Sequence, residues 1–303
     1  MEASILEPRS AVIQLSSGRL LSYAEWGRSG GRPVIHMHGM PGSRIERQAE
    51  PELYGRLGIR MITPDRPGYG NSDVHSGTLL DWAADVEELA DRLELPSFGI
   101  TALSGGGIYA LACAARFPER LTGVVVTGCP SPLVGPHALR KMSYLNRLGI
   151  RVTQRAPIVL ELGATLLSGV LRRYPQFFLS QINRDKVRPD RELLASPAVR
   201  TAVVATLREA ISHGTWGYVD DIRLLGAPWG FDPASIQVPV QFWHGDIDSV
   251  IPVHHAFLLA ERIPHSTLHL VPGEGHMLLW SHLEEVLTEA IGGIAAPVAA
   301  RVA

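Results

Sequence analysis

The chain has 303 residues, of which 46% are hydrophobic and 19% are charged, and its formal net charge at pH 7 is −2. Because 28 Lys and Arg are balanced by 30 Asp and Glu, the overall charge favours neither nucleic acid nor an anionic membrane as a partner. No apolar run approaches the ~20 residues of a spanning helix, and the first residues do not resemble a signal peptide. We therefore expect a cytoplasmic globular protein with a small-molecule substrate, present as a monomer or homodimer.

Strand-like and helix-like segments alternate along most of the chain, which is typical of a doubly wound α/β sheet. Strands are predicted at Ala11–Leu15, Arg19–Trp26, Pro33–His38, Arg60–Thr63, Ser97–Leu103, Leu121–Thr127, Val238–His244 and Thr267–Val271. Helices are predicted at Leu79–Leu93, Ile108–Phe117, Val253–Arg262 and Met277–Ile291. The only cysteines, Cys113 and Cys129, are expected to be buried and reduced.

The alternation stops between Gly128 and Gln237, where prolines mark both ends of the segment. We expect residues 130–235 to form a helical cap inserted into a core of residues 1–129 and 236–303. Such lids exclude water and shape a substrate pocket. The cap helices are predicted at Leu139–Leu148, Ile158–Leu171, Phe177–Ile182 and Ala198–Ser212.

The second and third of these cap helices carry more apolar residues than one buried stripe needs. They include Leu160, Leu162, Leu166, Leu167, Val170, Leu171 and Phe177. One interpretation, which we slightly favour, is that they pack the cap on itself and on the core. The other is that some of them line the crevice and make an apolar, medium-sized pocket.

The most informative segment joins a buried strand ending at Leu103 to an Ala-rich helix through Ser104 and three glycines. A serine at this corner lies at a helix N-terminus, where the N–H groups and the helix dipole favour an oxyanion. The corner is tight, and the residues two before and two after the serine, Ala102 and Gly106, are small. A phosphate-binding loop is disfavoured, because neither G-x-G-x-x-G nor Gly-Lys-Ser/Thr is present. Ser104 is therefore a candidate nucleophile.

Candidate partners for this serine follow it in the chain, each at the end of a predicted strand. Asp246 and Asp248 come after the strand that ends at His244, and His276 comes after the last strand. This order of serine, acid and histidine is the one expected for α/β-hydrolases. Two upstream motifs add to it: His-Gly-Met-Pro at 38–41 and Asp-Arg-Pro-Gly-Tyr-Gly-Asn-Ser at 65–72.

Through these motifs the chain resembles the α/β-hydrolase superfamily, from about Val12 to the last helix except for a weakly matching middle. The resemblance implies an α/β-hydrolase fold, with a mostly parallel eight-stranded sheet flanked by helices and an inserted all-helical cap. The family's Gly-x-x-Asp spacing, counted from Gly245, selects Asp248 as the acid and leaves Asp246 as a turn residue.

The resemblance also implies a division of roles at the site. Ser104 would attack an acyl carbon, His276 would act as general base, and Asp248 would orient the imidazole. The backbone N–H groups of Met40 and Gly105 would hold the resulting oxyanion. No metal and no organic cofactor is needed for this chemistry.

The pair His36 and His38 allows a different interpretation. Residues two apart on a strand share one face, and an H-x-H pair can bind a metal. No further ligand motif such as H-x-H-x-D-H follows, so we expect no metal site. His38 is expected instead to hold the turn that aims the Met40 N–H.

Four other polar residues are expected to have structural roles. His254 and His255 lie on a presumed helix surface, where solvated side chains are the preferred interpretation. Arg66 can tie loops together with its guanidinium group. Asp221, near the end of the inserted segment, is expected to end a helix or to form a salt bridge.

The sequence thus predicts a serine hydrolase that cleaves a small to medium, apolar carboxylic ester through an acyl-enzyme. The same triad would serve a C–C bond hydrolase, a lactonase or a small aminopeptidase. A slow hydrolase that acts as a ligand receptor is the alternative from another functional class. The sequence motifs do not extend into the cap, where substrate specificity is expected to lie.

Overall fold

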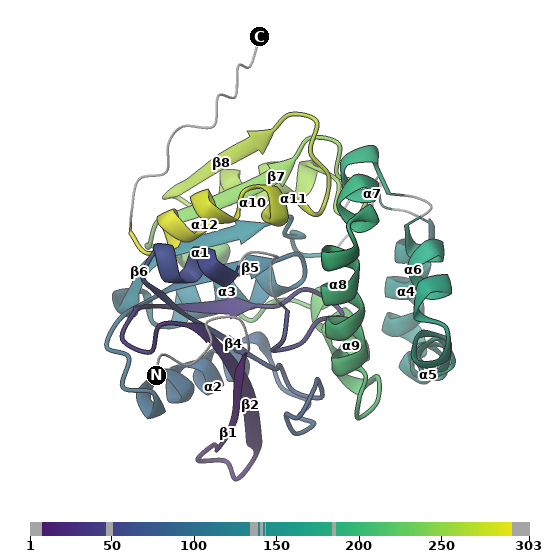
Figure 1. The fold of residues 1–303 in the computed structure, drawn as a ribbon, viewed down its shortest axis with the longest axis horizontal. Helices are drawn as coiled ribbons and strands as arrows, with labels where there is room; N and C mark the ends of the chain where they lie inside the picture. Colours follow the sequence, from purple (N-terminus) through teal and green to yellow (C-terminus); the bar gives the residue numbers. More distant parts are fainter. Residues whose placement is uncertain are drawn as a thin grey trace.

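The computed structural model describes residues 8–46, 51–133, 139, 142, 144–183 and 186–292. These residues form one eight-stranded sheet with helices on both faces and a group of helices beside one end of the molecule (Figure 1). The strands are β1 (Arg9–Gln14), β2 (Leu20–Gly27), β3 (Arg32–Met37), β4 (Ile59–Pro64), β5 (Phe98–Leu103), β6 (Leu121–Thr127), β7 (Val240–Gly245) and β8 (Ser266–Val271). The helices around the sheet are α1 (Pro51–Arg56), α2 (Leu79–Arg92), α3 (Gly106–Arg116), α10 (His254–Arg262), α11 (Leu278–Ser281) and α12 (Leu283–Ala290).

The strand order in the sheet is β1-β2-β4-β3-β5-β6-β7-β8. Only β2 runs against its neighbours, because it pairs antiparallel with β1 and β4 while all other pairs are parallel. The predicted mostly parallel, eight-stranded α/β sheet is thereby confirmed. Ligands of open parallel sheets bind beyond the carboxyl ends of the strands, and Ser104, Asp248 and His276 all follow such ends.

Both faces of the sheet are buried, which explains why its central strands read as continuous apolar runs. Ile35, Val124 and Phe242 belong to the core under α2, α3 and α10. Their chain neighbours Val34, Val125 and Trp243 point to the other face, against α1, α11 and α12. This alternation fixes the register of each strand, because a one-residue slip would exchange the two faces.

The described residues between β6 and β7 form six α-helices, which we call the helical insert. They are α4 (Tyr144–Arg155), α5 (Pro157–Arg173), α6 (Pro175–Ile182), α7 (Arg188–Ala195), α8 (Pro197–Ala210) and α9 (Trp216–Leu225). Figure 1 shows α7, α8 and α9 beside the sheet and α4, α5 and α6 farther out. No described helix combines the length and the apolar composition that crossing a bilayer requires.

Some predicted elements differ from the observed ones. The predicted helix Met277–Ile291 is two helices, α11 and α12, separated at His282. The sequence analysis did not anticipate α1, α7 or α9, which are short and lack a regular apolar stripe. The predicted helix Leu139–Leu148 falls partly outside the described residues, and α4 begins at Tyr144.

The apolar residues of α5 do not line the crevice. Leu166 is 76% exposed, and Leu162, Leu167 and Phe177 are also exposed, on the outer part of the insert. Leu171 is buried in a small core with Leu179, Leu207 and Ile211. Of the two interpretations, lining of the crevice is not observed, because no described residue of α5 belongs to the wall of the cavity beside Ser104. The favoured interpretation, packing, holds only for the inner side of α5.

The close packing of α3 against the end of β3 requires glycine at 106. A Cβ atom at Gly106 would lie 2.2 Å from the Met37 carbonyl oxygen and 2.6 Å from that of His38. Both are backbone atoms, which cannot swing away as a side chain can. This confirms the expectation that the corner around Ser104 tolerates only a small residue at 106.

We predict that Gly106→Ala lowers the free energy of unfolding by about 1–3 kcal/mol, the usual cost of overpacking. Gly163→Ala in α5 is the matched control, because nothing lies within 4 Å of a Cβ there and alanine favours a helix interior. Urea unfolding of both variants tests this. Equal stabilities of the two variants would contradict the packing argument.

Candidate active site

Ser104 occupies a sharp corner between β5 and α3. Its φ angle is 53°, a left-handed conformation that is strained for a residue with a Cβ atom. The corner is held on both sides: the Ser104 N–H donates to the Thr127 carbonyl oxygen at 2.8 Å, and its own carbonyl oxygen accepts the Gly107 N–H at 2.9 Å. The Ser104 residue consequently lies on the wall of a cavity that His276 also lines.

His276 and Asp248 are in direct contact. The His276 Nδ1 atom lies 2.7 Å from Asp248 Oδ2, and the other carboxylate oxygen accepts the N–H groups of Val250 at 2.7 Å and Ile251 at 2.9 Å. Asp246 points elsewhere and accepts the Gly273 N–H at 2.7 Å. Of the two neighbouring aspartates, the structure therefore brings Asp248 to the histidine.

The surroundings of Asp248 keep it ionised. Burial alone would raise the pKa of Asp248, but His276, His244 and the Ile251 N–H together hold this pKa below its usual range. His244, which the sequence analysis did not single out, lies with Nε2 3.5 Å from Asp248 Oδ2 and 2.8 Å from the Ile251 carbonyl oxygen. Burial lowers the pKa of His244, which favours a neutral ring there.

Met40 and Gly105 are neighbours in space, because a Cβ atom on Gly105 would come within 2.9 Å of the Met40 Cβ. Within the described part of the chain, neither backbone N–H group donates a hydrogen bond to a backbone or side-chain acceptor. Two free donors beside a serine form an arrangement that can bind an anionic oxygen.

A buried polar network supports the turn that carries Met40. Glu46 accepts the Gly39 N–H at 3.0 Å and lies 3.1 Å from His36 Nε2. His38 Nδ1 lies 2.9 Å from the Gly39 carbonyl oxygen, and burial together with the charge of Arg66 lowers the pKa of His38 well below its usual range. His38 thus contacts the turn as expected, whereas no sequence signal pointed to Glu46.

The helical insert contributes two further carboxylates next to these groups. Asp190 on α7 accepts the backbone N–H groups of His276 and Met277. Asp221 on α9 forms the expected salt bridge, and its partner is Arg66, which in turn binds the turn that carries Met40. The sequence analysis gave Asp190 no role and did not connect Asp221 with the site.

The cavity beside Ser104 and His276 has a volume of about 190 Å³ and a mostly apolar wall. Its lining comprises Gly39, Met40, Pro41, Glu46, Leu103, Ser104, Lys186, Leu194, Ala202, Val203, Thr206, Leu207, His276, Met277 and Trp280. The apolar residues come from both the core and the insert, chiefly from α8. The cavity thus lies between the carboxyl edge of the sheet and the helical insert.

One histidine, His255, differs from its expected placement. His255 is buried, and its Nδ1 atom lies 2.8 Å from the Ser131 hydroxyl. Burial and the neighbouring His254 lower the pKa of His255 to about 3. The prediction that His255 is solvated was wrong, because α10 turns that side toward the core. The described residues contain no cluster of three or more potential metal ligands.

Comparison with known proteins places this geometry in a family. The family model described as the alpha/beta hydrolase family matches residues 34–289, so the chain belongs to that family. It is similar to a putative non-heme chloroperoxidase of Synechocystis, at 26% identity over 84% of this chain and 88% of that protein.

Solved structures of other proteins share the fold. An esterase of Exiguobacterium antarcticum superposes with a TM-score of 0.68 and 20% identity, covering 93% of this chain and 98% of that one. An enol-lactonase of Burkholderia xenovorans superposes with a TM-score of 0.66 and 18% identity, covering 92% and 100%. The protein is thus an enzyme of the α/β-hydrolase fold.

Proposed function

We propose that this enzyme is a serine hydrolase that cleaves a small to medium, apolar carboxylic ester through an acyl-enzyme. The observation that carries the proposal is that three features occur together at one cavity. Ser104 is held at a strained corner, His276 is hydrogen-bonded to an ionised Asp248, and the N–H groups of Met40 and Gly105 have no acceptor among the described residues. No resident metal or organic cofactor takes part in this scheme.

In the acylation step, the Ser104 hydroxyl oxygen attacks the ester carbon while His276 accepts the hydroxyl proton. The carbonyl oxygen becomes an oxyanion and receives the N–H groups of Met40 and Gly105, each worth ~3 kcal/mol in comparable sites. The tetrahedral species then expels the alkoxide, which takes the proton from His276. Asp248 fixes the ring tautomer and stabilises the imidazolium that forms in between.

In the deacylation step, His276 takes a proton from a water molecule that attacks the acyl-enzyme. The second oxyanion uses the same two N–H groups, and its collapse releases the carboxylic acid and returns the proton to Ser104. We further propose that the helical insert acts as the cap over this site, with residues 130–235 as its bounds. Its side of the cavity, lined by Leu194, Val203 and Leu207, would exclude water from the acyl group.

The size and lining of the cavity support an apolar acyl group of short to medium length. An apolar cavity of about 150 Å³ can hold benzene, and this one is somewhat larger at about 190 Å³. An aminopeptidase is less well supported, because binding a substrate ammonium needs an available carboxylate. Glu46 is the only acidic residue on the described wall, and it is already engaged by Gly39 and His36.

Ser104 should be the one serine that reacts covalently. A fluorophosphonate probe is expected to label the wild type and not Ser104→Ala, because Ser104 shares a cavity with His276 and with the turn that carries Met40. Mass spectrometry of the labelled peptide and circular dichroism of both proteins are the measurements. Equal labelling of the folded variant would contradict the assignment, and absence of both labelling and ester turnover in the wild type would favour the receptor alternative.

The two aspartates after β7 should behave differently. Asp248→Asn should lower kcat by a factor on the order of 10⁴, as in the best studied triad, because the wrong imidazole tautomer is favoured. Asp246→Asn should retain most activity, since Asp246 contacts the Gly273 N–H and not His276, and an amide oxygen can still accept that hydrogen bond. Hydrolysis of a p-nitrophenyl ester by both variants tests this, and the reverse ranking would refute Asp248 as the orienting acid.

Acyl-chain preference should respond to the cavity wall and not to α5. Each buried methylene contributes up to ~0.8 kcal/mol, so kcat/KM of the wild type should rise several-fold per carbon until the cavity is full. Val203→Phe fills part of the cavity and should shift the optimum to shorter chains. Leu166→Phe, on the exposed side of α5, should leave the profile unchanged. A flat profile from acetyl to octanoyl in the wild type would refute the apolar pocket.

A further inference from the structure

The loop that carries His276 is bound by a carboxylate of the helical insert. Asp190 is 0% exposed; its Oδ2 atom accepts the His276 N–H at 3.1 Å and its Oδ1 atom accepts the Met277 N–H at 2.9 Å. Both N–H groups lie just before α11, whose first residue is Leu278. Asp190 therefore holds the backbone that leads into this helix although it lies 86 residues away in the chain.

The loop is built to admit this carboxylate. A Cβ atom at Gly275 would lie 2.4 Å from Asp190 Oδ1, so only glycine leaves room for the contact. The side chain of His276 points to Asp248 while its backbone is fixed by Asp190. The contact to the His276 ring thus comes from the core, and the contact to the His276 backbone comes from the insert.

A second carboxylate of the insert, Asp221, acts through Arg66 on the turn that carries the Met40 N–H. Arg66 donates from Nη1 to the His38 carbonyl oxygen at 2.6 Å and from Nη2 to the Gly39 carbonyl oxygen at 2.9 Å. The Gly39 carbonyl and the Met40 N–H belong to one planar peptide unit. Because the two groups point in opposite directions across a trans peptide, anchoring the carbonyl to Arg66 aims the N–H away from it.

Asp221 holds Arg66 in this position. The Arg66 guanidinium meets Asp221 at 2.6 Å through Nη2, and the Tyr69 hydroxyl donates to the same carboxylate at 2.7 Å. The Tyr109 hydroxyl donates to its other oxygen. Burial and the charge of Asp221 raise the pKa of both tyrosines well above their usual range, so they remain donors. This carboxylate is on α9 and hence on the insert.

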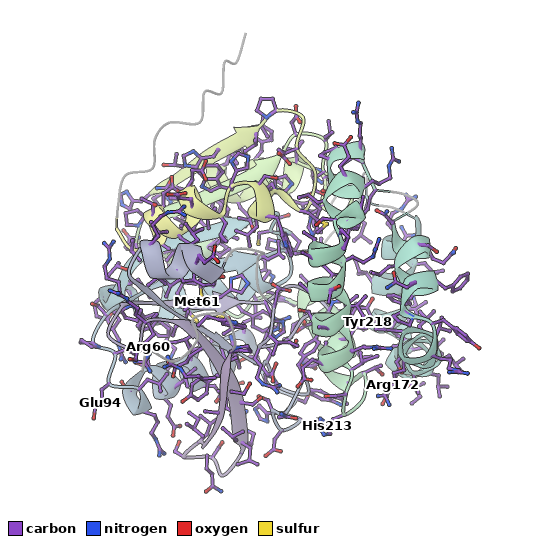
Figure 2. The ribbon with its side chains drawn as sticks, viewed as in Figure 1. Arg60, Met61, Glu94, Arg172, His213 and Tyr218 are labelled. Carbon is purple, nitrogen blue, oxygen red and sulfur yellow. The ribbon has the colours of Figure 1, made fainter. Side chains whose placement is uncertain are left out.

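The insert has other polar contacts with the core that touch neither group. Arg44 pairs with Glu209 at 2.5 Å, and His213 Nδ1 lies 2.6 Å from the Gly70 carbonyl oxygen. Figure 2 shows His213 at the lower end of the insert, and Tyr218 above it on the helix labelled α9 in Figure 1. These contacts can keep the insert docked by themselves. The contacts of Asp190 and Asp221 differ from these. Asp190 binds the His276 backbone directly, and Asp221 binds Arg66, which in turn binds the backbone of the turn that carries Met40.

We propose that Asp190 and Asp221 are positioning residues through which the docked insert assembles the active site. Asp190 sets the backbone of His276, and Asp221, acting through Arg66, sets the direction of the Met40 N–H. The insert then covers the substrate and also completes the catalytic geometry, so that an undocked insert leaves the site inactive. This inference rests on the proposed hydrolase function.

Asp190→Asn is the first test. An amide has one acceptor oxygen, so it can serve only one of the two N–H groups and presents its NH₂ to the other. We expect kcat for a short p-nitrophenyl ester to fall at least tenfold with KM changed less than twofold. Hydrogen exchange of the His276 and Met277 amides should become faster while that of β5 stays unchanged.

The matched control is Asp246→Asn, which removes a carboxylate contact from the same loop, at Gly273, without involving the insert. It should leave kcat within twofold of the wild type. A folded Asp190→Asn with wild-type kcat would overturn the inference. So would a loss of activity that only follows the loss of folded protein, as measured by thermal unfolding.

Removing Asp221 alone would leave Arg66 buried without a counter-ion, so a double variant, Arg66→Met with Asp221→Leu, is the better test of the second contact. It removes both charges together, which proteins tolerate better than one unpaired ion. We expect a folded protein whose affinity for phenylboronic acid, which forms a tetrahedral adduct with a serine, falls at least tenfold. Affinity for the product carboxylate should change less than threefold. Parallel losses for both ligands would refute the aiming role.

These experiments separate the inference from the proposed function. If the wild type neither hydrolyses esters nor reacts with the fluorophosphonate probe, the hydrolase proposal fails. The exchange measurement on Asp190→Asn still decides whether the insert holds the His276 backbone. Unchanged exchange would overturn that part on its own.

Discussion

The candidate site depends on how closely the start of α3 approaches the end of β3. Gly106 meets the Met37 and His38 carbonyl oxygens with no room for a Cβ atom, and the turn that carries Met40 follows directly after these two residues. The left-handed conformation of Ser104 costs about 1–3 kcal/mol. The central strands, buried on both faces, offset that cost. The site thus contains local backbone strain that the surrounding sheet makes tolerable.

Buried charges next to the site are better explained by geometry than by stability. A buried ion pair such as Arg66–Asp221 gains little net free energy, because desolvation opposes the attraction. The ion pair instead fixes the orientation of the turn, because a planar guanidinium binds two carbonyl oxygens of that turn and a carboxylate at once. In a low-dielectric interior such hydrogen bonds are stiff, which suits groups that must meet a transition state without rearranging.

The sequence predicted the sheet and the residues that follow its strands, because strand periodicity and the motifs around Ser104 and His276 are local signals. The Gly-x-x-Asp spacing chose Asp248 over Asp246, and the observed contact with His276 agrees with that choice. Asp190 and Glu46 escaped notice because nothing in their neighbourhood predicts a buried carboxylate, and their partners are fixed only by tertiary packing. The exposure of Leu166 was not predicted for a related reason. A helix that is apolar on most sides does not reveal which side faces solvent.

Most of the cavity wall that the insert supplies lies on α8, which carries neither proposed positioning residue. Ala202, Val203 and Leu207 are on α8, whereas Asp190 and Asp221 are on α7 and α9, and Leu194 is the wall residue on α7. Substitutions on α8 can therefore change the size of the acyl pocket while the backbones of His276 and Met40 stay where they are. Substrate choice and catalytic geometry would then vary independently within one inserted segment.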